Sequence, residues 1–336
     1  TQGVSSAASD VYKRQIKGVL FGLVLIPVSV GVLYWNESSG VKMQKTIAEG
    51  AANIISVKAG AVDPANNEKL IHVSGTVGTE EVLKDPLFPI AENGLRLSRT
   101  VEMFQWKETS KSEKTNNLGG GSQTTKTYSY NKTWSNKLID SKEFKQQQDH
   151  QNPRDKSVHD NMLIAQHAKL GAFKVTPTLI GMMKGDVGIS IKESDLDKLN
   201  GDLKGKAKLQ GEYLYLSVDP ANPAIGDMRI TFQVLKPGDF SVVAKQVGDT
   251  FGAYTAQAGQ TLERVEAGIV PASTMFQHAA SENSQRIWII RGIGFLVMSF
   301  GIGLILSPLT AFAEVIPFVG SIIEGGVTVS YTHLTL

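Results

Sequence analysis

Cysteine is absent from the 336 residues. A disulfide scaffold, a thiolate metal site and a cysteine nucleophile are therefore excluded. A basic surplus is lacking too, because 34 Lys and Arg stand against 32 Asp and Glu, and the formal net charge is +2. Proteins that bind nucleic acid usually carry a strong basic excess on one face, so nucleic acid is not an expected partner.

Charge is missing altogether from Gly292 to Ala313, a run of 22 residues. As a helix this run would be roughly 33 Å long, enough to cross a hydrocarbon core of about 30 Å. The alternative, a buried helix of a soluble protein, rarely exceeds about 14 apolar residues. We therefore expect an integral membrane protein, with a transmembrane helix at 287–313.

A second uncharged run extends from Gly18 to Trp35. Tyr34 and Trp35 close it in the manner of aromatic side chains at a membrane interface. A cleaved signal peptide is the alternative, but no small-x-small cleavage site follows the apolar run. The sequence thus predicts a retained transmembrane helix at 18–35.

The polar residues 38–286 are expected to form one large β-rich domain that begins and ends in helices. An amphipathic pattern predicts a helix from Ser38 to Val57, and 274–291 should be a helix that runs into the second span. Alternation indicates strands at 70–73, 95–108, 124–139, 212–218, 227–234, 240–246 and 262–266. The polar, Gln-rich segment 141–168 is expected to be partly helical, with a break at Asn152-Pro153.

Two of these strands, 95–108 and 124–139, flank a Gly-rich turn and so predict a long hairpin. Their aromatic residues fall at every second or fourth position, which gathers the rings on one face. We expect the rings to stack across the hairpin as structure, and only secondarily to form a ligand platform. The residues concerned are Phe104, Trp106, Tyr128, Tyr130 and Trp134.

Both ends look foreign to the rest of the chain. Residues 1–15 and 329–336 resemble translated sequencing adapters, and non-native tails of this kind are excluded from fold reasoning. The segment 314–328 is apolar but broken by Pro317 and Gly320, so it is expected to begin a further membrane segment that is truncated.

Catalytic patterns are lacking. The Gly-rich stretch at Gly119 does not fit the phosphate-loop pattern, the histidines show no metal-ligand spacing, and no G-x-S-x-G occurs. Glu102 and Glu108 could be paired acids, but a charged strand face is the commoner arrangement. No catalytic, cofactor-binding or metal-binding residue is predicted, and no cofactor. Asn36 and Asn131 each fit the N-glycosylation pattern, which matters only in a eukaryotic secretory setting.

Several segments together resemble the transmembrane protein 43 family, also called LUMA. They are YWNESSG at 34–40, LIHVSG at 70–75, LRLSRTVEMFQWKE at 95–108, the stretch 128–153, GDMRITFQV at 226–234 and RIWIIRGIGFLVM at 286–298. The resemblance covers roughly 18–325. Similar proteins have one span near the N-terminus and three near the C-terminus, so this chain, expected to be a bacterial or environmental homologue truncated at both ends, stops early.

The resemblance implies a fold and a setting. The fold class is an α+β integral membrane protein, whose β-rich extramembrane domain is flanked by helices, with transmembrane helices at both ends. The domain would be extracytoplasmic: periplasmic at the inner membrane in a bacterium, or lumenal at the endoplasmic reticulum and inner nuclear membrane in a eukaryote. Flanking charges do not decide which side of the membrane the domain faces. Lys17 before the first span favours a cytoplasmic N-terminus and so an extracytoplasmic domain, whereas Arg286 and Arg291 before the second span favour a cytoplasmic domain.

Two functions from different classes remain. The leading hypothesis is a non-enzymatic, membrane-anchored scaffold that acts by self-association and partner binding at the bilayer; animal relatives organise the nuclear envelope and endoplasmic reticulum with lamins and emerin. The alternative is a membrane-proximal enzyme that modifies lipids or the envelope, or a transporter accessory subunit. A polar cleft with clustered carboxylates or histidines would favour the alternative.

Overall fold

The computed structural model describes residues 2–116, 122–199 and 201–313. The predicted membrane segment at 314–328 and the tail at 329–336 lie outside these residues. The chain divides into two compact units. We call the described parts of Thr1–Lys45, Lys114–Thr124 and Ala279–Leu336 the helix unit, and Thr46–Glu113 with Thr125–His278 the β unit.

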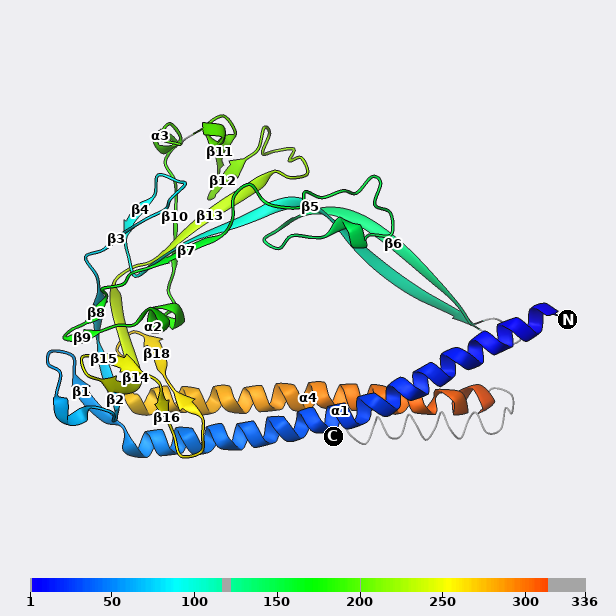
Figure 1. The fold of residues 1–336 in the computed structure, drawn as a ribbon, viewed down its shortest axis with the longest axis horizontal. Helices are drawn as coiled ribbons and strands as arrows, with labels where there is room; N and C mark the ends of the chain where they lie inside the picture. Colours follow the sequence, from blue (N-terminus) through cyan, green and yellow to red (C-terminus); the bar gives the residue numbers. More distant parts are fainter. Residues whose placement is uncertain (1, 117–121, 200, 314–336) are drawn as a thin grey trace. The chain divides into compact units, whose positions relative to one another are not determined.

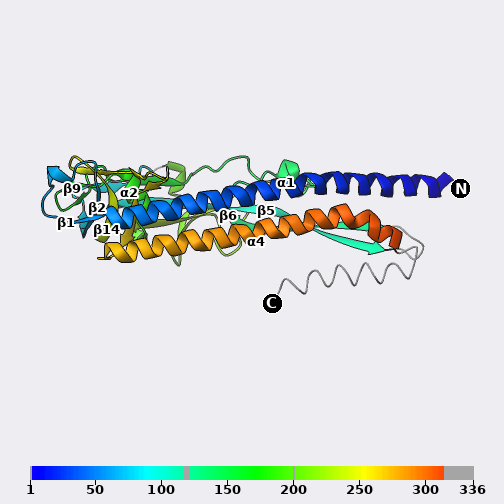
Figure 2. The ribbon, with the colours of Figure 1, turned by 90° about the horizontal axis from the view of Figure 1, so that it is seen from below.

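Two long helices dominate the helix unit. They are α1 (Gln2–Asn53) and α4 (Ala272–Ala313). Each contains a segment long and apolar enough to cross a membrane, which confirms the expected transmembrane helices at both ends of a β-rich domain. Figures 1 and 2 show α1 and α4 side by side. The helix expected from Ser38 to Val57 is not separate: it continues α1 without interruption at Gly40, but it ends at Asn53.

The β unit contains a seven-stranded sheet built from β1 (Ile55–Lys58), β2 (Leu70–Gly78), β8 (Lys169–Leu170), β9 (Phe173–Lys174), β15 (Thr250–Gly252), β14 (Gly238–Val247) and β18 (Arg264–Ala267), in that order. Because β2 also pairs with β14, the strands from β2 to β14 close into a ring. Buried apolar side chains fill this part of the unit; they include Ile71, Val73, Leu170, Phe173, Val242 and Phe251. The strand predicted at 70–73 is longer than expected, because β2 runs on to Gly78.

A second seven-stranded sheet follows the order β11 (Ala207–Gln210), β12 (Tyr213–Leu216), β13 (Met228–Leu235), β5 (Arg96–Asn116) and β6 (Ser122–Ser135), with β10 (Val187–Ile189) on β13 and β7 (Asn161–Ile164) on β5. The predicted hairpin is therefore confirmed as β5 and β6. Val101 and Met103 alternate with Glu102 and Phe104 along β5, and the structure shows that the face with Val101 and Met103 is the buried one.

Short elements complete the β unit. They are the two-stranded sheets β3 (Val82–Lys84) with β4 (Ala91–Asn93) and β16 (Tyr254–Thr255) with β17 (Thr261–Leu262), and the helices α2 (Pro177–Met182) and α3 (Glu193–Leu196). A buried ion pair joins Arg99 on β5 to Asp85, with 2.5 Å between Nη1 and Oδ1. The same oxygen accepts the backbone N–H groups of Leu87 and Phe88, which fixes the turn between β3 and β4.

The segment 141–168 corrects the sequence prediction. Its helical content is one 3₁₀ turn, Ser141–Glu143, and β7 occupies 161–164. The physical reason is local capture of the backbone by side chains, which competes with helix formation. Asp140 accepts the N–H of Lys142 at 2.9 Å, and the Ser141 hydroxyl accepts the N–H of Asn152 at 3.0 Å.

Candidate functional site

Close packing joins α1 and α4 within the helix unit. A Cβ atom built at Gly22 would lie 2.6 Å from the Gly301 carbonyl oxygen and 2.9 Å from Cγ1 of Ile305. A Cβ atom at Gly294 would lie 2.6 Å from Cδ2 of Leu33. Small residues at such points let helix backbones approach in membranes, where dispersion contacts and hydrogen bonds hold helices together. The two apolar helices thus form an antiparallel pair.

A polar belt marks one end of the paired apolar runs. Nε of Arg291 lies 2.6 Å from Oε1 of Glu37, and Nη2 lies 2.7 Å from Oε2, so the pair is bidentate. Trp35 and Trp288, each more than half exposed, lie under Arg286 and Arg291 respectively. Charged and aromatic side chains of this kind position helices at a membrane–water boundary.

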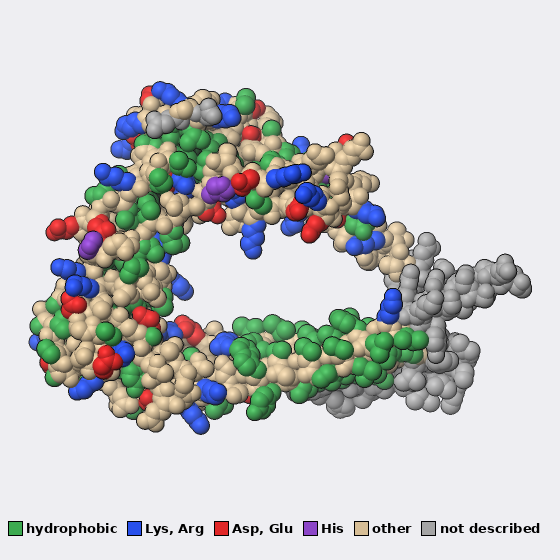
Figure 3. Space-filling view, in the orientation of Figure 1, with side chains coloured by type: hydrophobic (Ala, Val, Ile, Leu, Met, Phe, Trp, Pro, Cys, Tyr) green, Lys and Arg blue, Asp and Glu red, His purple; other side chains and the backbone are tan. Residues whose placement is uncertain are grey.

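The faces of the two helices that point away from their contact are apolar and exposed. Figure 3 shows this hydrophobic surface along α1 and α4. Side chains on it that are more than half exposed include Leu20, Phe21, Val24, Leu296 and Phe300. In water such a surface would be costly, whereas lipid tails or another apolar helix would cover it.

The aromatic residues of the hairpin form one half-buried surface, as alternation predicted. Phe104 on β5 contacts Trp134 on β6 with 5.1 Å between ring centroids, so the two rings meet across the hairpin, but at a tilt of 48° rather than stacked. Arg229 on β13 lies over the rings of Trp134 and Tyr213, and its Nε donates to Glu102 at 2.6 Å. The surface is therefore knit together by cation–π contacts and an ion pair.

Tyr130 makes a different set of contacts. Its ring stacks on His150 at 3.8 Å, and its hydroxyl donates to Oε2 of Glu108 at 2.6 Å. That hydrogen bond is the main cause that holds the pKa of Glu108 below its usual value near 4.5. Burial, followed by the bond to Glu108, raises the pKa of Tyr130. The segment after β6 is thereby fastened to the hairpin.

The glutamates considered as paired acids are not brought together. Glu102 pairs with Arg229, while Glu108 accepts hydrogen bonds from Tyr130 and from the N–H of Lys145. Six residues of strand separate them, roughly 20 Å. Among the described residues, no group of three His, Asp or Glu side chains is placed to hold a metal ion.

The two N-glycosylation triplets differ in accessibility. Asn36 is 1% exposed, and its Nδ2 donates to the carbonyl of Ile287 at 3.2 Å, so its amide is occupied by the helix pair. Asn131 on β6 is exposed. Only the second triplet presents its amide to solvent in this fold.

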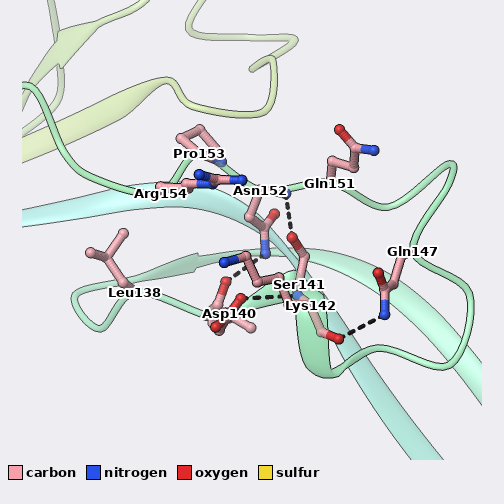
Figure 4. Close-up of a pocket in the computed structure, with 10 residues that line it drawn as sticks. Leu138, Asp140, Ser141, Lys142, Gln147, Gln151, Asn152, Pro153 and Arg154 are labelled. Atoms are coloured by element: carbon pink, nitrogen blue, oxygen red, sulfur yellow. Dashed lines mark hydrogen bonds between the residues drawn. The ribbon is translucent and has the colours of Figure 1, made fainter.

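A cavity of about 590 Å³ is the feature that sequence reasoning missed. It lies in the β unit between the end of β6 and the segment that leads to β7, and Figure 4 shows its lining. The lining residues are Leu138, Ile139, Asp140, Ser141, Lys142, Gln147, Gln151, Asn152, Pro153 and Arg154. No spacing pattern in the sequence predicts this cavity, because the cavity forms where a segment without regular structure folds back on β5.

Comparison with known proteins gives a consistent relationship. The family model for Transmembrane protein 43 matches residues 103–336. Transmembrane protein 43 of Homo sapiens is 28% identical over 320 residues, which cover 92% of this chain and 78% of the human protein. The Drosophila melanogaster homolog is 26% identical over 307 residues, covering 88% of this chain and 78% of its own length. No solved structure matches the chain. Because the family model covers more than half of its residues, the chain belongs to the transmembrane protein 43 family.

Proposed function

We propose that this protein is a non-enzymatic, membrane-anchored scaffold whose β unit binds partners at the bilayer and whose membrane helices support self-association. The observation that carries the proposal is that one membrane helix, α1, precedes the β unit in the chain and another, α4, follows it, and that these two helices pack closely on each other. Attachment by two helices restricts how a domain can tilt at a membrane. A restricted domain suits a scaffold, because it holds its binding surface in one orientation for partner proteins.

The helix pair supplies the surface for self-association. Its contact face is already filled by glycine and leucine packing, while its outer faces carry exposed Phe21, Leu296 and Phe300. Such faces can be covered by lipid or by a second copy, since lipid tails are as apolar as the side chains. The β unit is proposed to be extracytoplasmic: periplasmic in a bacterial cell, lumenal in a eukaryotic one.

Self-association is tested by cross-linking, which the cysteine-free sequence makes clean. Single cysteines at Phe21 and Phe300 are placed on outer faces, and one at Leu33 lies on the face that contacts Gly294. In lipid nanodiscs and native membranes we expect disulfide-linked dimers from at least one outer position and little from the Leu33 position. A chain that is strictly monomeric by light scattering in detergent, forms no cross-link in membranes and retrieves no partner from them would contradict the scaffold.

The side of the membrane is tested separately, with Ser110→Cys at an exposed position of β5. A membrane-impermeant maleimide should label intact cells if the β unit is extracytoplasmic. Labelling only after lysis would place the unit in the cytosol, where ATP and nicotinamide cofactors are available, and would reopen the enzyme hypothesis.

A further inference from the structure

The cavity at 138–154 has walls that are held in place from within the β unit. Nδ2 of Asn152 donates to the carbonyls of Trp106 and Ile139 at 2.9 and 3.1 Å, and Oδ1 accepts the N–H of Trp106 at 2.7 Å. Gln147 donates to the carbonyl of Lys142 at 2.7 Å, as Figure 4 shows. The segment is therefore fastened to β5 and to itself, so the cavity is a built feature of the fold.

Arg154 is an exposed arginine of the lining, and Lys142 is exposed as well. Within the described part of the chain, its guanidinium has no ion pair, hydrogen bond or ring contact. The other arginines whose side chains are described all have partners; they are Arg96, Arg99, Arg229, Arg264, Arg286 and Arg291. A planar group with five donors therefore lines the cavity, and no other residue that the structure describes uses any of them.

Two further donors line the same cavity. No carboxylate among the described residues pairs with the Lys142 ammonium. The Ser141 hydroxyl accepts the N–H of Asn152, which leaves its own proton to donate. The lining has one carboxylate, Asp140, and one of its oxygens already accepts the N–H of Lys142. With two cations against one anion in the lining, the cavity favours an anionic group.

We propose that this cavity binds a phosphate monoester. The Arg154 guanidinium can hold two phosphate oxygens at once, Lys142 adds a point charge, and Ser141 adds a hydroxyl donor. Leu138, Ile139 and Pro153 supply an apolar wall for the organic part of the ligand. The phosphate is the recognised chemistry, and it can be carried by a soluble ester or by a phospholipid headgroup.

The test uses the full chain in a neutral detergent and measures binding by calorimetry with three ligands. Glycerol 3-phosphate represents a soluble phosphate monoester, and dioctanoyl phosphatidic acid represents a lipid with an exposed phosphate monoester. Dioctanoyl phosphatidylcholine is the control, because its phosphate is a diester within a zwitterionic headgroup. We expect saturable binding of at least one of the first two, with a dissociation constant of about 1 mM or tighter. Binding of both identifies the phosphate alone as sufficient, and binding of the phosphatidic acid alone identifies a lipid headgroup.

Variants distinguish the cavity from general charge attraction. Arg154→Gln and Lys142→Gln should each weaken the affinity by about tenfold, the usual loss for a hydrogen bond to a charged group. Arg154→Lys, which keeps the charge but not the planar fork, should recover part of it. Lys145→Gln, an exposed lysine of the same segment that does not line the cavity, should bind as the parent does.

Three results would overturn the proposal. They are no saturation up to about 10 mM glycerol 3-phosphate and about 1 mM phosphatidic acid, equal losses in Arg154→Gln and Lys145→Gln, and equal binding of phosphatidylcholine. The scaffold proposal does not depend on this outcome, because it concerns the helices and is tested by cross-linking.

Discussion

The contact between Gly22 and Gly301 should fail if either residue acquires a large side chain. In Gly22→Leu, the new Cβ would lie 2.6 Å from a backbone oxygen of α4, which cannot rotate away as a side chain can. The helices must then separate or shift. Overpacking of this kind costs about 1–3 kcal/mol, which is a roughly 5- to 150-fold change in the equilibrium between packed and separated helices.

The assay places spin labels at Tyr34→Cys and Ile289→Cys, two exposed positions on α1 and α4. Pulsed electron resonance follows the short-distance population while the full chain in neutral detergent is titrated with SDS. In Gly22→Leu, we expect the population to vanish at a lower SDS fraction than in the parent. Gly31→Leu is the matched control, because it adds the same side chain to the same helix where a Cβ meets nothing within 4 Å.

A second matched pair tests the same contact from α4. A Cβ at Gly301 would meet side-chain atoms of Ile26 and Leu25 at 3.3 Å, whereas one at Gly303 meets nothing within 4 Å. Gly301→Leu should therefore lower the SDS midpoint by less than Gly22→Leu but by more than Gly303→Leu. Equal midpoints for Gly22→Leu and Gly31→Leu would refute the helix pairing.

Three further predictions concern the β unit and are measured by thermal or denaturant unfolding of the full chain. Asp85→Asn leaves the Arg99 charge buried without its carboxylate, so it should lower stability by about 3–5 kcal/mol. Tyr130→Phe should flatten the acid-induced loss of stability between about pH 6 and pH 3. The hydrogen bond from Tyr130 lowers the pKa of Glu108 in the folded state, so the contribution of Glu108 to stability is complete above its usual pKa near 4.5. That contribution is lost as the pH falls through the pKa of Glu108 in the folded state. Gly171→Ala should cost more than the roughly 1–2 kcal/mol of a left-handed backbone alone, because φ is +60° and the new Cβ would overlap Ala59.

Each of these has a control on the same unit. Glu113→Gln breaks an exposed ion pair with Lys111 and should change stability by less than about 0.5 kcal/mol. Tyr128→Phe removes a hydroxyl that makes no hydrogen bond to Glu108 and should leave the acid limb unchanged. Gly248→Ala has φ of +61° but open space around its Cβ, so it should show the strain alone. Indistinguishable values within any of these pairs would contradict the corresponding reasoning.

The elements that depend on short-range pattern were predicted from the sequence. A run without charge, such as 292–313, predicts a membrane helix by itself, since its length and apolar composition do not depend on residues elsewhere in the chain. The hairpin of β5 and β6 was predictable for the same reason, because the alternation along 101–104 places Val101 and Met103 on one face of the strand and Phe104 on the other. The prediction of partly helical structure for 141–168 was wrong. Its composition favours a helix, but the Asn152 amide hydrogen-bonds to Trp106, 46 residues away in sequence, and holds the segment against β5.

The candidate sites were less accessible to sequence reasoning because they are made by partners distant in the chain. Arg154 is one of several basic residues in a Gln-rich stretch, and its lack of a partner is visible only when every neighbouring carboxylate has been placed. Glu37 follows the first apolar run and Arg291 precedes the second. That they form one bidentate pair follows from the antiparallel packing of α1 and α4, which no local pattern contains.

Glycine makes the same point within a single run. The chain has 33 glycines, and Gly22 and Gly31 both lie in the first apolar run. In a soluble helix either would cost roughly 1 kcal/mol relative to alanine. At Gly22 that cost is offset by a backbone contact with Gly301, whereas Gly31 faces open space and makes no contact that offsets the cost. The residue type is identical and the role is not, because the role is set by a helix about 280 residues further along the chain. Substitution at the two positions therefore measures the tertiary contact directly, with helix propensity and hydrophobicity held constant.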